Sequence, residues 1–175
     1  DQIINYINKN SFNLKIDVVE EKDKILGTGG GILNAINHFS DKPFLIINPD
    51  TIWNSNYLNE IKLIEKIFYN NKSVKCSLLV VKKEKSFDKS LKGDFNLKNN
   101  IINKINLNKL HYIYTGVQIA NPKIFYGFEE KFLSLNKVWD QLIKKNQLYG
   151  VESNIDFLHV STLNIYNNLL KKFNN

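Results

Sequence analysis

Residues 26–36, LGTGGGILNAI, place four of the chain's eight glycines in five positions, directly before a run that reads as a helix. Glycine costs about 0.5–1 kcal/mol in a helix or strand interior relative to alanine, so such a cluster indicates that something approaches the backbone closely. Free N–H groups at the start of a helix suit an anion or the polar edge of a base. The alternative is a tight turn that packs the helix on a sheet. The stretch matches no phosphate-binding fingerprint that would decide between the two.

Hydrophobic spacing around this stretch predicts alternating helices and strands in the first half of the chain. The expected elements are a helix over 1–9, a strand over 14–20, a helix over 32–39, a strand over 43–48, a helix over 57–70 and a strand over 75–83. Such an alternation predicts a mainly parallel central sheet flanked by helices.

The second half of the chain predicts a smaller, mixed β region. Short strands are expected over 94–97, 101–105, 111–119 and 148–152, and helices over 122–128, 137–145 and 162–173. At 175 residues with 43% hydrophobic content, the chain can bury one sizeable core. We therefore expect a single α/β domain over residues 1–175 with a Rossmann-like, mainly parallel half followed by a mixed half.

Composition narrows the function classes. No apolar run is long enough to cross a bilayer and no leader pattern is present, so a cytoplasmic protein without a membrane partner is expected. The formal charge of +7 comes from scattered lysines, which argues against nucleic acid as a partner. The single cysteine, Cys76, lies in the apolar run CSLLVV and is expected in a buried strand.

Asp50 follows the expected strand over 43–48, at the end where ligands of alternating α/β folds usually bind. A carboxylate there suits a hard divalent ion such as Mg²⁺, which usually takes one or two carboxylates while substrate phosphates complete its shell. The sequence Asn-Pro-Asp-Thr is also good turn chemistry, so a hydrogen-bonded turn is the alternative.

The order of motifs along the whole chain resembles that of the sugar-1-phosphate nucleotidyltransferases. The resemblance is carried by a glutamate at 20 or 21 and by LGTGGGILNAI, PFLIINPDTIW, GDFNL, YTGVQIANPKIF, FLSLNKVWDQLI, LYGVE and HVSTLNIYN. It is strongest to the branch of N-acetylmuramate-1-phosphate uridylyltransferase and mannose-1-phosphate guanylyltransferase-like proteins. The resemblance implies a nucleotide-diphospho-sugar transferase fold.

The reaction that the resemblance implies is attack of a sugar-1-phosphate oxygen on the α-phosphorus of a nucleoside triphosphate. Pyrophosphate leaves and a nucleotide sugar forms, with Mg²⁺ neutralising charge. The uridylyltransferase branch implies UTP and an N-acetylated sugar-1-phosphate for cell-wall synthesis or recycling. GTP with a mannose-type sugar, or a nucleotide-binding remnant without catalysis, are the alternatives, and the oligomeric state stays open.

The resemblance also implies roles for individual residues. Asp50 is implied as the catalytic, metal-binding carboxylate. The implied nucleotide-binding residues are Glu21, Thr28, Gly29, Gly30 and Gly31, and the implied sugar-binding residues are Gly93, Asp94, Thr115, Gly116 and Asn136. Trp139 lies in the same segment as Asn136 but suits core packing equally well.

The chain departs from the family pattern in two places. The family's opening glycine-rich loop with its Arg and Lys has no counterpart, and the chain contains no methionine, so a domain truncated at its N-terminus and incomplete as an enzyme is expected. Many relatives use an Asp as a second metal ligand where this chain has His159, and imidazole nitrogen suits Mg²⁺ poorly. His159 is then a metal ligand, a hydrogen-bonding group or a sign of a weakened site. His38 and His111 have no partner constellation and are expected to be structural or exposed.

Overall fold

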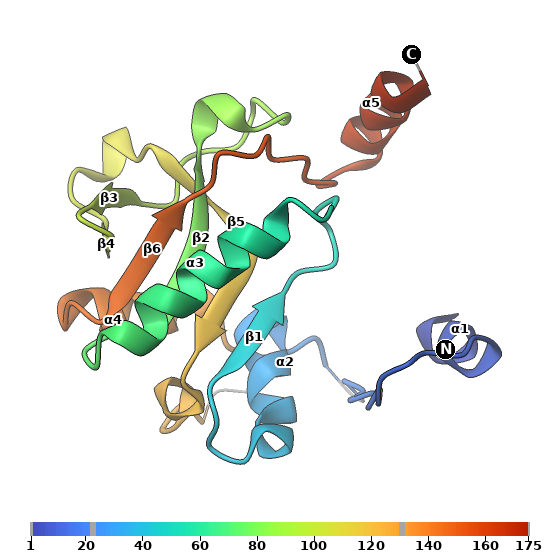
Figure 1. Cartoon of the computed structure of the whole chain (residues 1–175), viewed down its shortest axis with the longest axis horizontal. Helices are drawn as coiled ribbons and strands as arrows, with labels where there is room; N and C mark the ends of the chain where they lie inside the picture. The colour runs from blue at the N-terminus through green and yellow to red at the C-terminus, as the bar shows by residue number, and fades with distance from the viewer. Residues whose placement is uncertain (1, 22–23, 130–131, 175) are drawn as a thin grey trace.

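The computed structural model describes residues 2–21, 24–129 and 132–174 (Figure 1). The α-helices are α1 (Gln2–Lys9), α2 (Gly27–Ala35), α3 (Tyr57–Asn70), α4 (Leu135–Lys144) and α5 (Leu163–Asn174). The strands are β1 (Phe44–Ile47), β2 (Cys76–Lys82), β3 (Asn96–Lys98), β4 (Ile101–Asn103), β5 (Tyr112–Ala120) and β6 (Leu148–Glu152). The 3₁₀ turns are η1 (Ile36–Phe39), η2 (Lys83–Lys85), η3 (Leu107–Lys109) and η4 (Pro122–Phe125).

The strands form one six-stranded sheet in the order β1-β5-β2-β6-β4-β3. Among the strand pairs of the described residues, only β2–β6 is parallel, whereas β5 pairs antiparallel with both β1 and β2. The prediction of a mainly parallel sheet is therefore wrong. The sheet is not mainly parallel because β5, from the second half of the chain, inserts between β1 and β2 and runs antiparallel to both.

Strand direction nevertheless places three strand ends together. Since β1 and β2 both run antiparallel to β5, they point the same way, and β6 runs parallel to β2. The segments that follow β1, β2 and β6 consequently leave the sheet at the same end (Figure 1). That end carries Asp50, η2 and the chain that leads to His159.

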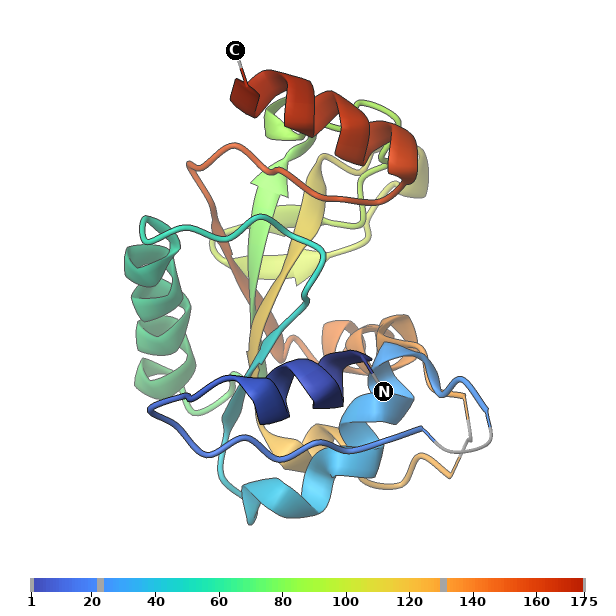
Figure 2. The same cartoon turned by 90° about the vertical axis from the view of Figure 1, so that its right-hand side faces the viewer.

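Helices cover both faces of the sheet. Figure 2 shows the sheet nearly edge-on, with α3 on one side and α2 and α4 on the other. One buried cluster lies under α3 and includes Tyr57, Ile64 and Leu79, while another lies on the α2 and α4 side and includes Phe95 and Trp139. The central strand β2 is buried on both faces from Cys76 to Val81, which confirms the prediction for Cys76.

The predicted strand over 14–20 is wrong, because the structure has no strand there and every residue of the segment is exposed. A strand is stable only when a neighbouring strand takes up its backbone hydrogen bonds. Among the described residues, β1 is an edge strand that pairs with β5 alone. The 14–20 segment therefore has no neighbouring strand to take up its backbone hydrogen bonds. The preceding helix α1 has no buried residue and stands apart from the sheet (Figure 1).

The glycine stretch is helical from its start, so the helix predicted over 32–39 begins earlier and ends in η1. The turn between β3 and β4 places Asn99 and Asn100 at φ 50° and 63°, which fits the left-handed conformation of a tight hairpin turn. Within the described residues, no helix is long and apolar enough to span a membrane.

Candidate functional site

Asp50 and His159 lie side by side at the sheet end where β1 leaves. The Asp50 carbonyl accepts a hydrogen bond from the Val160 N–H at 2.7 Å, and the Ile52 N–H donates to the Leu158 carbonyl at 2.9 Å. This short pairing, centred on a bridge between Thr51 and His159, fixes the two segments against each other. It brings His159 Nε2 to 3.2 Å from Asp50 Oδ2.

The Asp50 carboxylate is open to a ligand. Its side chain is 46% exposed, and no described residue donates a hydrogen bond to Oδ1. A hollow of about 370 Å³ borders it, between the Asp50 loop and the apolar residues of α5. The His159 ring stacks on Phe157 at 5.5 Å, and its buried Nδ1 has no hydrogen-bond partner among the described residues.

A divalent ion at this arrangement would take one protein carboxylate and complete its shell with water or phosphate oxygens. Among the described residues, no group of three or more His, Cys, Asp or Glu side chains could hold a metal. One open carboxylate is compatible with Mg²⁺, whose shell substrate phosphates usually complete. His159 Nε2 faces the carboxylate itself, which makes a polar contact with Asp50 the role that the geometry favours.

The start of α2 is fixed from two sides. Glu21 Oε2 accepts a hydrogen bond from the Leu26 N–H at 2.8 Å, so this carboxylate anchors the segment that leads into the helix. On the other side, the Gly30 N–H donates to the Leu133 carbonyl at 3.2 Å. Gly29 and Gly30 are buried, and a Cβ on Gly29 would lie 2.7 Å from the Leu133 oxygen.

Thr28 and Gly31 face a second hollow of about 350 Å³, which runs along β1 and also contains Asn48 and Pro49. Pro49 also borders the hollow beside Asp50, so the two hollows adjoin. The structure therefore brings part of the glycine stretch and Asp50 to one region. The other glycines of the stretch pack against residues 132–133.

Two of the predicted sugar-side residues, Gly93 and Asp94, lie beside the first half of β5. Asp94 Oδ2 accepts a hydrogen bond from the Tyr114 backbone N–H at 2.9 Å. Burial raises the pKa of Asp94, although this hydrogen bond and the charge of Lys104 lower it in part. A Cβ on Gly93 would overlap the Leu110 carbonyl, so glycine is required for close packing there.

The remaining predicted sugar-side residues divide between core and surface. Thr115 points into the core, where its hydroxyl donates to the Leu79 carbonyl at 2.9 Å. Gly116 has φ +95°, which disfavours other residues, and a Cβ there would lie 2.9 Å from Asn48 Cβ. Asn136 Oδ1 accepts a hydrogen bond from Lys104 Nζ at 3.2 Å. The Gly116–Asn48 contact thus joins the two halves of the predicted site.

Two polar groups that the sequence analysis missed lie on the same face of β5. The Tyr114 hydroxyl and Gln118 Nε2 are buried without a hydrogen-bond partner among the described residues, on either side of Gly116. Gln118 Oε1 accepts from Trp139 Nε1 at 3.0 Å, which confirms a packing role for Trp139. Burial raises the pKa of Tyr114, and the charge of the Asp50 carboxylate adds to this, so the hydroxyl stays a neutral donor. The alternation of side chains along the strand predicted over 111–119 could have revealed that these residues share a face.

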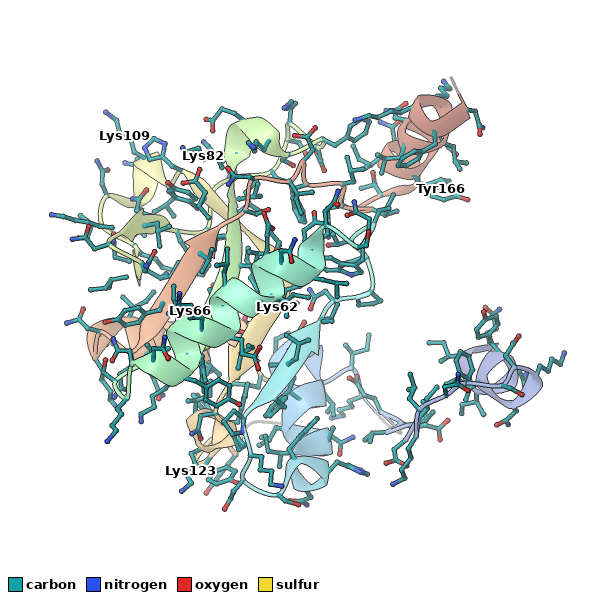
Figure 3. All side chains as sticks on the ribbon, viewed as in Figure 1. Lys62, Lys66, Lys82, Lys109, Lys123 and Tyr166 are labelled. Carbon is teal, nitrogen blue, oxygen red and sulfur yellow. The ribbon has the colours of Figure 1, made fainter. Side chains whose placement is uncertain are left out.

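Lysine side chains do not line either hollow at Asp50 within the described chain. Figure 3 shows labelled lysines spread over α3, the end of β2 and separate loops, in agreement with the scatter seen in the sequence. His38 lies 3.8 Å from Asp17, and His111 is exposed at the start of β5. Both histidines lie outside the predicted site, as expected.

Solved structures with this fold include nucleotidyltransferases and their complexes. HddC from Yersinia pseudotuberculosis has a TM-score of 0.69 at 22% identity over 99% of this chain and 74% of that chain. The same protein complexed with GMP-PN has a TM-score of 0.68 at 21% identity over 98% of this chain and 73% of that chain. The inositol-1-phosphate CTP transferase from T. maritima has a TM-score of 0.65 at 15% identity over 84% of this chain and 60% of that chain.

Similarity in sequence is weaker than similarity in structure. No family model matches the chain, and no curated protein matches it significantly. At these identities, the comparisons show the fold, a mixed α/β nucleotidyltransferase-like fold with a mostly antiparallel sheet.

Proposed function

We propose that this chain carries the nucleotidyl-transfer site of an enzyme that joins a nucleoside monophosphate to a sugar-1-phosphate and releases pyrophosphate. The observation that carries the proposal is the open Asp50 carboxylate, which borders one hollow and adjoins, through Pro49, a second hollow at the start of α2. Asn48, which lines the second hollow, packs against Gly116 of the predicted sugar side. The shared fold with nucleotidyltransferases supports this assignment.

Asp50 is the proposed catalytic and metal-binding residue. A Mg²⁺ ion held there with phosphate oxygens would neutralise the charge that develops at the α-phosphorus. His159 would orient the carboxylate through the contact between Nε2 and Oδ2, which are 3.2 Å apart. The second aspartate of the family pattern is therefore replaced here by a hydrogen-bonding group and not by a second anionic ligand.

The nucleotide is proposed to lie along the hollow between α2 and β1. Thr28 and Gly31 border that hollow directly, whereas Gly29 and Gly30 would contribute by keeping the helix start close to residues 132–133. Glu21 would act by holding Leu26, because its carboxylate is already engaged there.

The sugar-1-phosphate is proposed to bind on the β5 side, near Gly93, Asp94, Gly116 and Asn136, with Thr115 supporting the strand from the core. The buried Tyr114 hydroxyl and Gln118 side chain line neither hollow and would support this region from the core, as Thr115 does. The phosphates need cations, and the described lining of the hollows contributes no lysine. We propose that the full phosphate-binding site includes groups beyond those that the described chain brings to Asp50.

The resemblance favours UTP with an N-acetylated sugar-1-phosphate. A guanine nucleotide is the second candidate, because the Yersinia protein with the same fold is complexed with GMP-PN. Thermal unfolding with UTP, GTP, CTP or ATP, each with Mg²⁺, would test the proposal, because a ligand that binds the folded state raises the melting temperature. We expect UTP or GTP to raise it in a Mg²⁺-dependent way, and equal shifts by all four nucleotides or by none would contradict the proposal.

A further inference from the structure

The segment 157–161, called here the His159 segment, is held between two loops that come from different parts of the chain. On one side, Ile52 and Val160 donate the backbone hydrogen bonds that pair this segment with the Asp50 loop. On the other side, the Phe157 N–H donates to the Lys85 carbonyl and the Phe87 N–H donates to the Phe157 carbonyl, both at 2.9 Å.

Asp88 completes the second attachment. It is only 5% exposed, and its Oδ2 accepts a hydrogen bond from the Ser161 hydroxyl at 2.8 Å. Oδ1 accepts from both the N–H and the hydroxyl of Ser90, at 2.9 and 2.6 Å. A buried carboxylate with this many hydrogen bonds remains ionised, and the hydrogen bonds from Ser90 and Ser161 lower the pKa of Asp88.

The consequence is that the His159 segment is held between two carboxylates. Asp50 lies at 3.2 Å on the Nε2 side, and Asp88 is tied to Ser161, two residues after the histidine. The described chain has no third metal-ligating side chain at Asp50, so the attraction for a divalent ion depends on charge in the surroundings as well as on direct ligands.

We propose that Asp88 is a positioning residue for the Asp50 site, which fixes the His159 segment through Ser161 and supplies a second negative charge behind the imidazole. The inference rests on the proposed function, since it concerns the affinity of that same site for a divalent ion. Asp88 itself does not touch the ion. It holds His159 in its position beside Asp50 and makes the electrostatic potential at Asp50 more negative.

Two variants separate these effects. Asp88→Asn removes the charge of the side chain but keeps one oxygen that can accept a hydrogen bond. Ser161→Ala keeps the carboxylates of Asp50 and Asp88 and removes the hydrogen bond that joins Asp88 to the His159 segment. Asp156→Asn is the matched control, because it removes one negative charge from an exposed residue directly before the His159 segment.

The probe is Mn²⁺ alone, added to the whole 175-residue chain while the ring protons of the three histidines are followed by NMR. A paramagnetic ion broadens nearby protons and its effect falls steeply with distance, so binding at Asp50 broadens His159 before the exposed His111. Thermal unfolding of each variant verifies that it is folded.

We expect Asp88→Asn to raise the Mn²⁺ concentration for half-broadening of His159 about three- to tenfold, Ser161→Ala to raise it by a smaller factor, and Asp156→Asn to leave it within about twofold. Unchanged broadening in folded Asp88→Asn, or an equal change in Asp156→Asn, would overturn the inference. Asp50→Asn distinguishes it from the proposed function: selective broadening that persists in Asp50→Asn contradicts the metal role of Asp50 itself.

Discussion

The carbonyl oxygen of Leu133 lies 2.7 Å from the position that a Cβ on Gly29 would occupy. The neighbouring Gly30 N–H donates a hydrogen bond to the same oxygen at 3.2 Å. The first turn of α2 therefore rests directly on the backbone that precedes α4. This contact gives at least one glycine of the stretch a packing role, whereas Gly31 borders the hollow along β1.

Gly29→Ala is expected to destabilise the protein by about 2 kcal/mol, because the added methyl group forces the Leu133 backbone away and strains a packed contact. The better helix propensity of alanine offsets only part of this loss. Urea unfolding monitored by circular dichroism measures the change. A variant as stable as the wild type would show that the helix start and residues 132–133 separate easily.

Gly31→Ala is the matched change for ligand binding. Its Cβ would meet only the end of the Glu21 side chain, at 3.1 Å, so we expect a stability loss below about 1 kcal/mol. Because Gly31 borders the hollow, the added methyl group should lower the affinity for the nucleotide several-fold in a calorimetric titration. Unchanged affinity would mean that the nucleotide does not lie against the start of α2.

Tyr114→Phe is expected to stabilise the free protein by about 1 kcal/mol, because it removes a buried hydroxyl that has no partner among the described residues. Urea unfolding monitored by circular dichroism measures the change. Tyr112→Phe is the control, since the Tyr112 hydroxyl donates to Glu152 at 3.0 Å and its removal should reduce stability. A stability loss in Tyr114→Phe would contradict this and show that the hydroxyl makes a stabilising contact.

The buried carboxyl group of Asp94 leads to a prediction of how the stability of the protein depends on pH. Because burial raises its pKa in the folded state above the ordinary 3.8, folding favours the protonated form. The stability that this group contributes is present below its unfolded pKa and is lost as the pH rises through the folded pKa. Asp94→Asn should therefore raise the free energy of unfolding at about pH 7 and leave it nearly unchanged at about pH 3. Urea unfolding at both values checks this, and an equal gain at both would contradict it.

The 175-residue chain is expected to release little pyrophosphate from a nucleoside triphosphate and a sugar-1-phosphate in the presence of Mg²⁺. The reason is that no lysine among the described residues lines the hollows at Asp50, while the triphosphate requires cationic contacts. A coupled pyrophosphate assay with a set of nucleotides and sugar phosphates measures the rate. Rapid turnover would show that the chain already supplies all the charge that the reaction needs.

The strongly periodic elements could be predicted from the sequence. The helix at α3, the buried strand β2 and the short β3–β4 hairpin formed near the expected positions, because their hydrophobic spacing and turn residues act locally. The order of strands could not be predicted in this way. Insertion of β5 between β1 and β2 is a long-range pairing, and the spacing within each strand is the same whichever neighbour it has.

The position of Asp50 could be predicted from the sequence, because the apolar run over 43–48 indicates where the preceding strand ends. Asp50 lies just after β1 beside His159, as their positions in the family pattern implied. The strand predicted over 14–20 was wrong because alternation identifies a segment able to pair but not whether a partner is present. The free polar atoms of Tyr114 and Gln118 depend on which side chains surround them in three dimensions, and no local pattern encodes that.

Calorimetric titration of the wild-type chain and Asp50→Asn with UTP and with GTP, each with and without Mg²⁺, tests the central claim most directly. The amide introduced by this substitution keeps the side-chain shape and the hydrogen-bonded loop but lacks the charge that holds the ion. The account predicts that Mg²⁺ strengthens nucleotide binding to the wild type and that this strengthening disappears in a variant of nearly unchanged thermal stability. Equal enhancement by Mg²⁺ in both proteins would contradict the assignment of Asp50 as the metal-binding residue of a nucleotidyl-transfer site.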